Sequence, residues 1–224
     1  MSLVRWQNVL FLILTFGDIV LYAPKKKIPH ALFHGIGFLF GFLPQMIVWK
    51  IVYGSFLLIP MGNETMHWVQ PHILSVLFSA RHGLFTWNPV FIISILGLCI
   101  LYKKNKQITI YLLVTFLLQV YINAVPTNWW CGSSYGYRRL LDCLPIFILG
   151  LAIFINLFSQ KVSIRIIYAI GLLFILWNVG LMSQFAFGII SHTEPVSFLE
   201  IFKNQFTQVP EKIGTILRYI VLRH

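Results

Sequence analysis

The chain has 224 residues, of which 58% are hydrophobic and only 10% are charged, and its mean hydropathy is +0.81. A soluble globular domain carries about 25% charged residues, so this composition excludes that class. The 17 Lys and Arg residues against 6 Asp and Glu residues give a net charge of +11. Because these bases flank apolar runs, anionic lipid headgroups are better partners for them than nucleic acid, and we expect no nucleic-acid binding.

Apolar runs bounded by charged residues or proline predict an all-α, polytopic membrane protein with about six transmembrane helices. The predicted spans are about 3–23, 31–53, 89–102, 108–124, 140–158 and 165–187. The first run continues to Pro24 without a small-x-small cleavage site, which favours a retained helix over a signal peptide. Residues 1–187 then form the transmembrane domain. Residues 188–224 form an amphipathic tail, in which the apolar spacing at 209–222 predicts a short helix on the membrane surface.

Lysines lie in the short connections that follow the first, third and fifth predicted spans. The positive-inside rule places these connections in the cytoplasm, and alternation then places the loops 54–88 and 125–139, together with the tail, on the outer side. Arg81, Arg138 and Arg139 are bases on the side where few are expected. Their presence there, like that of the four bases of the tail, needs a physical reason.

Some residues inside the spans predict how the helices pack. The fourth span carries a polar residue at every fourth position, at Gln107, Tyr111, Thr115, Gln119 and Asn123. Such a stripe cannot face hydrocarbon, so it predicts either hydrogen bonds to a neighbouring helix or the wall of a wet cavity. In the first span Asp18 predicts a pair with Lys25 or another basic neighbour. In the second span Gly37 and Gly41 have the spacing that lets two helices approach closely.

The first outer loop contains the next informative pattern. His72, Ser75, Ser79 and His82 recur at intervals of three or four residues, which predicts an interfacial helix within the loop 54–88. This helix would hold His82 and Arg81 at headgroup depth, close to Trp87. The histidines lack the spacing of helical metal ligands and have no accompanying carboxylate repeat, so we expect no metal and no cofactor.

The second outer loop is rich in rings, glycines and arginines. It carries Trp129, Trp130, Tyr135 and Tyr137 around Gly132 and Gly136, and then Arg138, Arg139 and Asp142. A membrane-interface aromatic belt explains the rings alone. Guanidinium groups bind phosphate bidentately, and rings on glycine turns offer surfaces for sugar rings, so one interpretation is an anion site. The other is a structural ion pair between Asp142 and one of the two arginines, and both remain open.

Three stretches resemble the later half of bacterial GT-C glycosyltransferases, relatives of the protein mannosyltransferases and the aminoarabinose transferase. They are FGFLPQMIVWKIVYG at 40–54, FSARHGLFTWNP at 78–89 and NWWCGSSYGYRRLLDCLP at 128–145. The resemblance implies an enzyme of the bacterial cytoplasmic membrane that transfers a sugar from a polyprenyl-phosphate carrier at the outer face. Members of that family carry an acid-bearing first outer loop that supplies the general base. Nothing in this chain matches that loop, so we assign no catalytic residue.

The resemblance also implies a substrate site and partners. Arg81, His82, Arg138 and Arg139 would hold the carrier phosphate, Trp87, Trp129, Trp130 and Tyr135 would line the sugar or lipid path, and Asp142 is the acid nearest the second loop. The expected partners are membrane lipid, the polyprenyl-phosphate-linked sugar and a subunit that carries the missing acidic loop. The alternative is a non-catalytic accessory or translocation subunit that binds the same lipid carrier.

Overall fold

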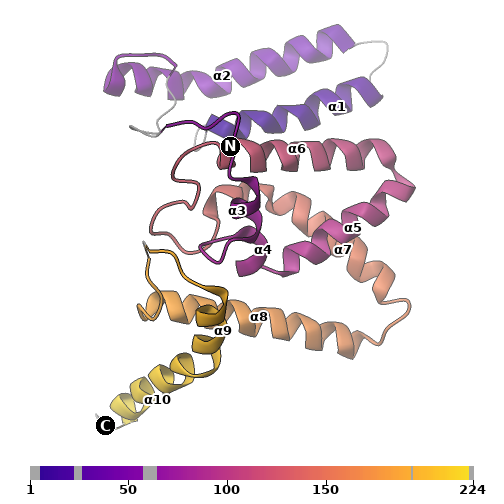
Figure 1. Ribbon diagram of the computed structural model, residues 1–224. Helices are drawn as coiled ribbons and strands as arrows, with labels where there is room; N and C mark the ends of the chain where they lie inside the picture. Colours follow the sequence, from indigo (N-terminus) through magenta and orange to yellow (C-terminus); the bar gives the residue numbers. More distant parts are fainter. Residues whose placement is uncertain (1–5, 23–26, 58–64, 193, 222–224) are drawn as a thin grey trace.

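A computed structural model describes residues 6–22, 27–57, 65–192 and 194–221 of the chain (Figure 1). The described residues are α-helical and contain no strand, only an isolated bridge between Met66 and Pro126. The elements in chain order are η1 (Trp6–Phe11), α1 (Leu12–Tyr22), α2 (Lys27–Tyr53), α3 (Ile73–Phe78), α4 (Leu84–Trp87), α5 (Val90–Lys104), α6 (Lys106–Ala124), η2 (Arg138–Cys143), α7 (Leu144–Phe158), α8 (Ile164–Ala186), α9 (Phe198–Phe206) and α10 (Gln208–Val221).

Four segments of the described chain are long and apolar enough to cross a membrane: Ile28–Tyr53, Lys106–Ala124, Arg138–Phe158 and Ile164–Ala186. They indicate a multi-pass membrane protein. The other two of the six predicted spans contain helices that are too short to count among these segments. The first consists of a short 3-10 turn and the 11-residue α1. The third is the 15-residue α5, and a helix of that length covers about 22 Å of the roughly 30 Å hydrocarbon layer.

The turns between the long helices alternate between two ends of the bundle (Figure 1). The α5–α6 turn, with Lys104 and Lys106, and the α7–α8 turn, with Lys161, lie at the right of the view, beside the end of α1 and the start of α2. Helices α3 and α4 and the ends of α6 and α8 lie toward the opposite end. The lysine-bearing turns therefore share one end, and the aromatic loops share the other.

The closest helix contact joins α5 and α7. A Cβ added to Gly97 would clash with the carbonyl oxygen of Gly150, so each helix needs a glycine where the two backbones meet. Beside this contact the rings of Phe91 and Phe147 stack with centroids 4.2 Å apart. Helix α5 is thereby held along α7 although it is short.

The polar stripe of α6 packs against η1 at its buried end. Gln119 Nε2 donates to the carbonyl oxygen of Gln7 at 3.0 Å, and Gln7 Nε2 donates to Asn123 Oδ1 at 3.0 Å. All three side chains are buried. Hydrogen bonding between helical segments is therefore the alternative that the structure realises for Gln119 and Asn123. The expected pairing of Asp18 with Lys25 lies outside the described side chains.

Helix α2 does not use its glycines as the sequence predicts. A Cβ added to Gly37 or Gly41 would meet nothing within 4 Å, so neither glycine allows a close approach to another described helix. No residue within the most apolar part of this span is buried among the described residues. The predicted close contact through Gly37 and Gly41 is wrong, and α2 presents these faces to its surroundings.

The interfacial helix expected within 72–82 is interrupted. Helix α3 ends at Phe78 and α4 begins at Leu84, with a tight turn between them. In this turn His82 has a φ of 64°, a left-handed conformation that cannot continue a helix. His72 and His82 therefore do not lie on one helical face. The tail holds two helices, α9 and α10, and α10 confirms the helix expected at 209–222.

Candidate functional site

The two aromatic loops meet at the end of the bundle opposite the lysine-bearing turns. The guanidinium carbon of Arg81 lies 4.2 Å from the ring centroid of Trp130, within the range of a cation–π contact. Close by, the rings of Trp87 and Tyr135 meet edge to face with centroids 5.1 Å apart. Residues of 79–87 and of 130–135 thus pack against each other.

The turn between α3 and α4 holds Arg81 in place. The backbone N–H of Arg81 donates to Ser79 Oγ at 3.0 Å, and the indole N–H of Trp87 donates to the Ala80 carbonyl at 2.8 Å. Trp87 is only 1% exposed, so its indole is a fixed part of the core. The turn is therefore tied on both sides of Arg81, which leaves the guanidinium with a restricted range of positions.

His82 is a buried and neutral part of this turn. Burial, and to a lesser degree the charges of Arg81 and His192, lower the pKa of His82 to about 4. Its ring lies 4.8 Å from that of Trp87, and its Nδ1 has no hydrogen-bond partner among the described residues. A neutral imidazole adds no positive charge to the phosphate site in which the resemblance to the GT-C transferases placed His82.

Arg81 retains its charge in a partly buried position. Burial lowers its pKa, and the nearby carboxylate of Glu194 raises it. A guanidinium group stays protonated under such shifts because its pKa in water is above 12. Arg81 is therefore a permanent cation that is partly shielded from solvent.

The arginines of the second loop occupy different positions from Arg81. Arg139 donates from Nη2 to Asn128 Oδ1 at 2.7 Å. Arg138 is exposed and lines a pocket of about 170 Å³ together with Asn88, Tyr135 and other residues of the loop. Burial raises the pKa of the Cys131 thiol, whereas the charges of Arg139 and Arg138 lower it. The ion pair between Asp142 and one of these arginines stays a prediction.

Trp129 lies on the inner side of the second loop. Its ring lies 5.9 Å from that of Trp130 and perpendicular to it, and 6.0 Å from that of His72. It also packs against the buried core formed around α5, α6 and α7. Trp129 therefore packs between the core and Trp130, and Trp130 is the ring that contacts Arg81.

The end of α8 contributes residues that the sequence analysis did not single out. Phe185 lies 5.7 Å from Tyr135 and 4.0 Å from His192, measured between ring centroids. Asn178 donates to Asn88 Oδ1 at 2.9 Å and accepts a hydrogen bond from the Tyr135 hydroxyl at 3.1 Å through its carbonyl oxygen. An asparagine within a mainly apolar span was the sequence signal that pointed to this contact.

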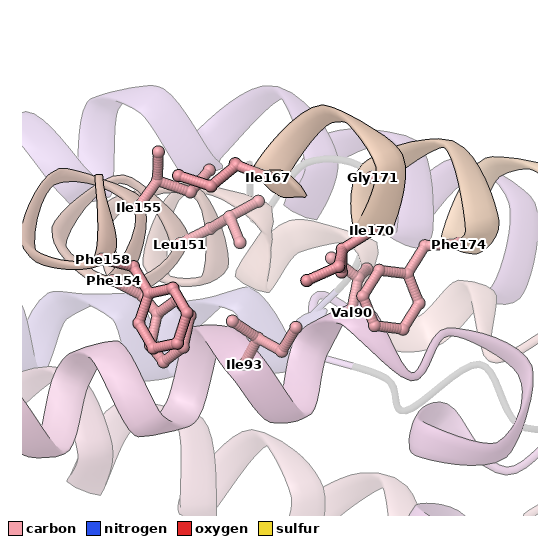
Figure 2. Close-up of a pocket in the computed structure, with 10 residues that line it drawn as sticks. All are labelled: Val90, Ile93, Leu151, Phe154, Ile155, Phe158, Ile167, Ile170, Gly171 and Phe174. Carbon is pink, nitrogen blue, oxygen red and sulfur yellow. The ribbon is translucent and has the colours of Figure 1, made fainter. Parts of the chain in front are cut away.

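An apolar pocket of about 210 Å³ opens between α5, α7 and α8 (Figure 2). Its walls are apolar side chains and Gly171, at Val90, Ile93, Leu151, Phe154, Ile155, Phe158, Ile167, Ile170, Gly171 and Phe174. Val90 is only two residues from Asn88, which lines the pocket of Arg138. The first turn of α5 therefore lies between a basic pocket in the loops and an apolar pocket among the helices.

Within the described part of the chain, no group of three or more His, Cys, Asp or Glu residues could hold a metal ion. Comparisons with models of known families, with curated protein sequences and with solved structures give no match. These findings describe a helical protein with four candidate membrane spans and assign it to no family.

Proposed function

We propose that the chain binds a polyprenyl-phosphate-linked sugar at the outer face of the bacterial cytoplasmic membrane, as a portion of a membrane glycosyltransferase. The observation that carries this proposal is the contact of Arg81 with Trp130, at 4.2 Å. It joins a permanent cation of one loop to an aromatic ring of the other. Both come from stretches that resemble the GT-C transferases.

The geometry of a stacked arginine suits phosphate binding. Stacking uses the flat face of the guanidinium group, whereas its N–H groups lie in the plane of the group and point outward. Two of them can bind two phosphate oxygens in parallel, and partial burial strengthens such bonds. Arg81 is therefore the residue proposed to hold the carrier phosphate.

The second loop supplies the proposed surface for the sugar and a second cation. Trp130 and Tyr135 provide rings with an apolar face and a polar edge, on which sugar rings commonly stack. Arg138 is exposed at the mouth of its pocket, where it can attract an anionic headgroup. His82 and Arg139 are proposed to support the site, because one is neutral and the other already donates to Asn128.

The apolar pocket offers a place for the lipid part of the ligand. Its lining has no charged side chain, and two of the three helices around it, α7 and α8, belong to segments that are long and apolar enough to cross a membrane. An isoprenoid chain seated there would leave its phosphate near the first turn of α5. The ligand would then contact both pockets at once.

Binding is tested with purified protein in phosphatidylcholine nanodiscs and a lipid-linked sugar of the polyprenyl-phosphate type. We expect Arg81→Ala to weaken binding by about tenfold or more, the effect of losing one hydrogen-bonded charge. Arg165→Ala is the matched control, because Arg165 lies at the start of α8, at the end with the lysine-bearing turns. Equal binding by the two variants would contradict the proposed phosphate site.

Transfer is tested in the same preparation by following release of the free carrier phosphate. Release in the presence of an acceptor and of a partner subunit with an acidic loop would support the transferase. Binding without release under those conditions would instead assign the chain to the alternative, a non-catalytic lipid-carrier-binding subunit.

A further inference from the structure

Asn88 lies at the junction between the basic pocket and the apolar pocket. It is two residues before the start of α5 and lines the pocket of Arg138. Its backbone N–H donates to the Leu84 carbonyl at 3.0 Å, and its own carbonyl accepts from the N–H of Phe91 at 3.0 Å. Val90, the first residue of α5, lines the apolar pocket. A ligand that extends from one pocket into the other would therefore pass close to Asn88.

Asn178 of α8 fixes the orientation of the Asn88 amide. Its Nδ2 donates to the backbone carbonyl oxygen of Trp87 at 3.1 Å and to Asn88 Oδ1 at 2.9 Å. Because a backbone carbonyl can only accept, the bond to Trp87 identifies which end of the Asn178 amide is the donor. The atom of Asn88 that faces this donor is then its oxygen. The NH₂ group of Asn88 is therefore directed away from Asn178.

The Asn88 NH₂ group borders open space beside Gly136. A Cβ added to Gly136 would lie 3.9 Å from Asn88 Nδ2 and would meet no other atom within 4 Å outside its chain neighbours. Gly136 also lines the pocket of Arg138. Among the residues that the structure describes, none accepts a hydrogen bond from Asn88 Nδ2. Its two N–H bonds are therefore available to a ligand in this pocket.

The polar groups around this pocket favour a ligand that accepts hydrogen bonds. Backbone carbonyl oxygens of its lining already accept main-chain hydrogen bonds, at Leu84, Asn88, Gly136 and Tyr137. The hydroxyl groups of Tyr135 and Tyr137 donate to backbone carbonyls outside the lining. The guanidinium group of Arg138, like the Asn88 NH₂ group, can only donate. An anion with several oxygens, such as a phosphate group, matches these donors.

We infer that Asn88 is a phosphate-binding residue, which donates from Nδ2 to an oxygen of the lipid phosphate, and that Asn178 is the residue that positions this donor. The inference rests on the proposed function, because it concerns the phosphate of the proposed lipid ligand. A lipid chain in the apolar pocket would bring its phosphate to the start of α5, where Asn88 lies. Arg138 supplies positive charge in the same pocket. A free phosphate ion has the same oxygens but gains nothing from the apolar pocket, so the site favours a lipid phosphate.

Binding of dodecyl phosphate to the purified protein in phosphatidylcholine nanodiscs at pH 7.5 tests the role of Asn88. We expect Asn88→Ala to weaken binding about tenfold, the effect of losing one hydrogen bond to a charged group. We expect Asn88→Asp to weaken binding further, because the carboxylate keeps one oxygen for Asn178 but presents its other oxygen to the phosphate. Asn156→Asp is the matched control, since Asn156 is exposed near the end of α7, at the end with the lysine-bearing turns, and it should not change the affinity.

Asn178→Ala tests the positioning role in the same assay. It removes the group that directs the Asn88 amide, so we expect a smaller loss of affinity than in Asn88→Ala. Adding Asn178→Ala to Asn88→Ala should cause no further loss, because the two residues act as a unit. Losses that simply add in the double variant would mean that Asn178 does not act through Asn88.

Other results would overturn the inference. If Asn88→Asp binds as well as the unmodified chain while Asn88→Ala binds weakly, Asn88 serves only to hold Asn178. If Asn88→Ala binds normally and only Asn88→Asp is weakened, Asn88 donates no hydrogen bond to the phosphate. Displacement of dodecyl phosphate by an equal concentration of inorganic phosphate would exclude a lipid phosphate as the preferred ligand. If Arg81→Ala weakens binding and no Asn88 variant does, the inference is wrong while the proposed phosphate site stands, and if the unmodified chain does not bind dodecyl phosphate, the proposed function itself is wrong.

Discussion

Arg81 and His82 are neighbours in the sequence but have different electrostatic properties in the fold. Arg81 stacks on Trp130 and remains charged, whereas His82 turns inward beside Trp87 and becomes neutral. Sequence patterns identified both residues, together with Trp130, because bases are unusual in a loop predicted to lie outside and because Trp130 shares its loop with two arginines. They could not identify the neutrality of His82, which depends on burial beneath Phe185 and Trp87.

The pKa of His82 predicts a pH dependence of stability. Since its folded pKa of about 4 lies below the ordinary value of 6.5, the unfolded chain binds a proton that the folded chain does not. Above pH 6.5 His82 is neutral in both states and the fold keeps its full stability. As the pH falls from 6.5 toward 4, the unfolded chain gains a proton at His82 and the fold loses stability relative to it. The free energy of unfolding should therefore decrease in this window, by up to about 1.4 kcal/mol per pH unit.

The control for this prediction is His82→Asn. Asparagine tolerates the left-handed backbone of this position and does not titrate in the window. Thermal unfolding in detergent between pH 7 and pH 5 should show a smaller decrease for His82→Asn than for the unmodified chain. Parallel curves would mean that His82 is not the group responsible.

At the scale of elements, helix positions were predictable and helix contacts were not. The apolar runs located α2, α6, α7 and α8, because about 20 apolar residues in sequence are sufficient to indicate a span. The glycine pattern, in contrast, indicated Gly37 and Gly41, whereas the close contact is made by Gly97 and Gly150. Each of the latter is a single glycine in its helix at the meeting point, and a spacing rule within one helix cannot detect such a pair.

Gly97→Ala tests the contact of α5 with α7. The added methyl group would clash with the backbone of Gly150, so the helices must separate, and we expect a loss of about 1–3 kcal/mol in the free energy of unfolding. Gly37→Ala makes the same change in α2, where nothing lies within 4 Å, and should not destabilise the protein. Thermal unfolding in detergent measures both. Equal stability of the two variants would refute the close contact.

Gly171→Phe tests whether the apolar pocket holds a lipid chain. The new ring would occupy the space between α8 and α5, because a Cβ at Gly171 meets nothing within 4 Å. We expect affinity for a long-chain polyprenyl phosphate to fall about tenfold or more, since the loss of only about two buried CH₂ groups at about 0.8 kcal/mol each already corresponds to that factor. Affinity for a phosphate whose chain is too short to fill the pocket, such as butyl phosphate, should fall much less.

Leu172→Phe is the matched control for the pocket, because Leu172 is 54% exposed on the same helix and does not line the pocket. The Leu172→Phe variant should bind the long-chain and the short-chain phosphate as the unmodified chain does. The apolar pocket would not be the binding site of the lipid chain if Gly171→Phe and Leu172→Phe bound the long-chain lipid equally well.

At the scale of the whole molecule, the alternation of turns places the loop lysines and Arg81 at different ends of the helices. The lysine-bearing turns gather at one end, and Arg81 lies with the aromatic loops toward the other, which agrees with the order deduced from the positive-inside rule (Figure 1). This arrangement was predictable because each span reverses the direction of the chain. The contribution of the end of α8 and of the residues just after it was not predictable, since Phe185 and His192 form no motif and reach the site only through folding.

Photo-crosslinking tests the central claim most directly, with the protein in nanodiscs and a polyprenyl-phosphate analogue that carries a diazirine beside its phosphate. The account predicts that peptide mapping finds the label in residues 78–88 and 128–139, and that Arg81→Ala reduces it in both segments. Labelling concentrated at the α5–α6 and α7–α8 turns, or spread along α2, would contradict the account.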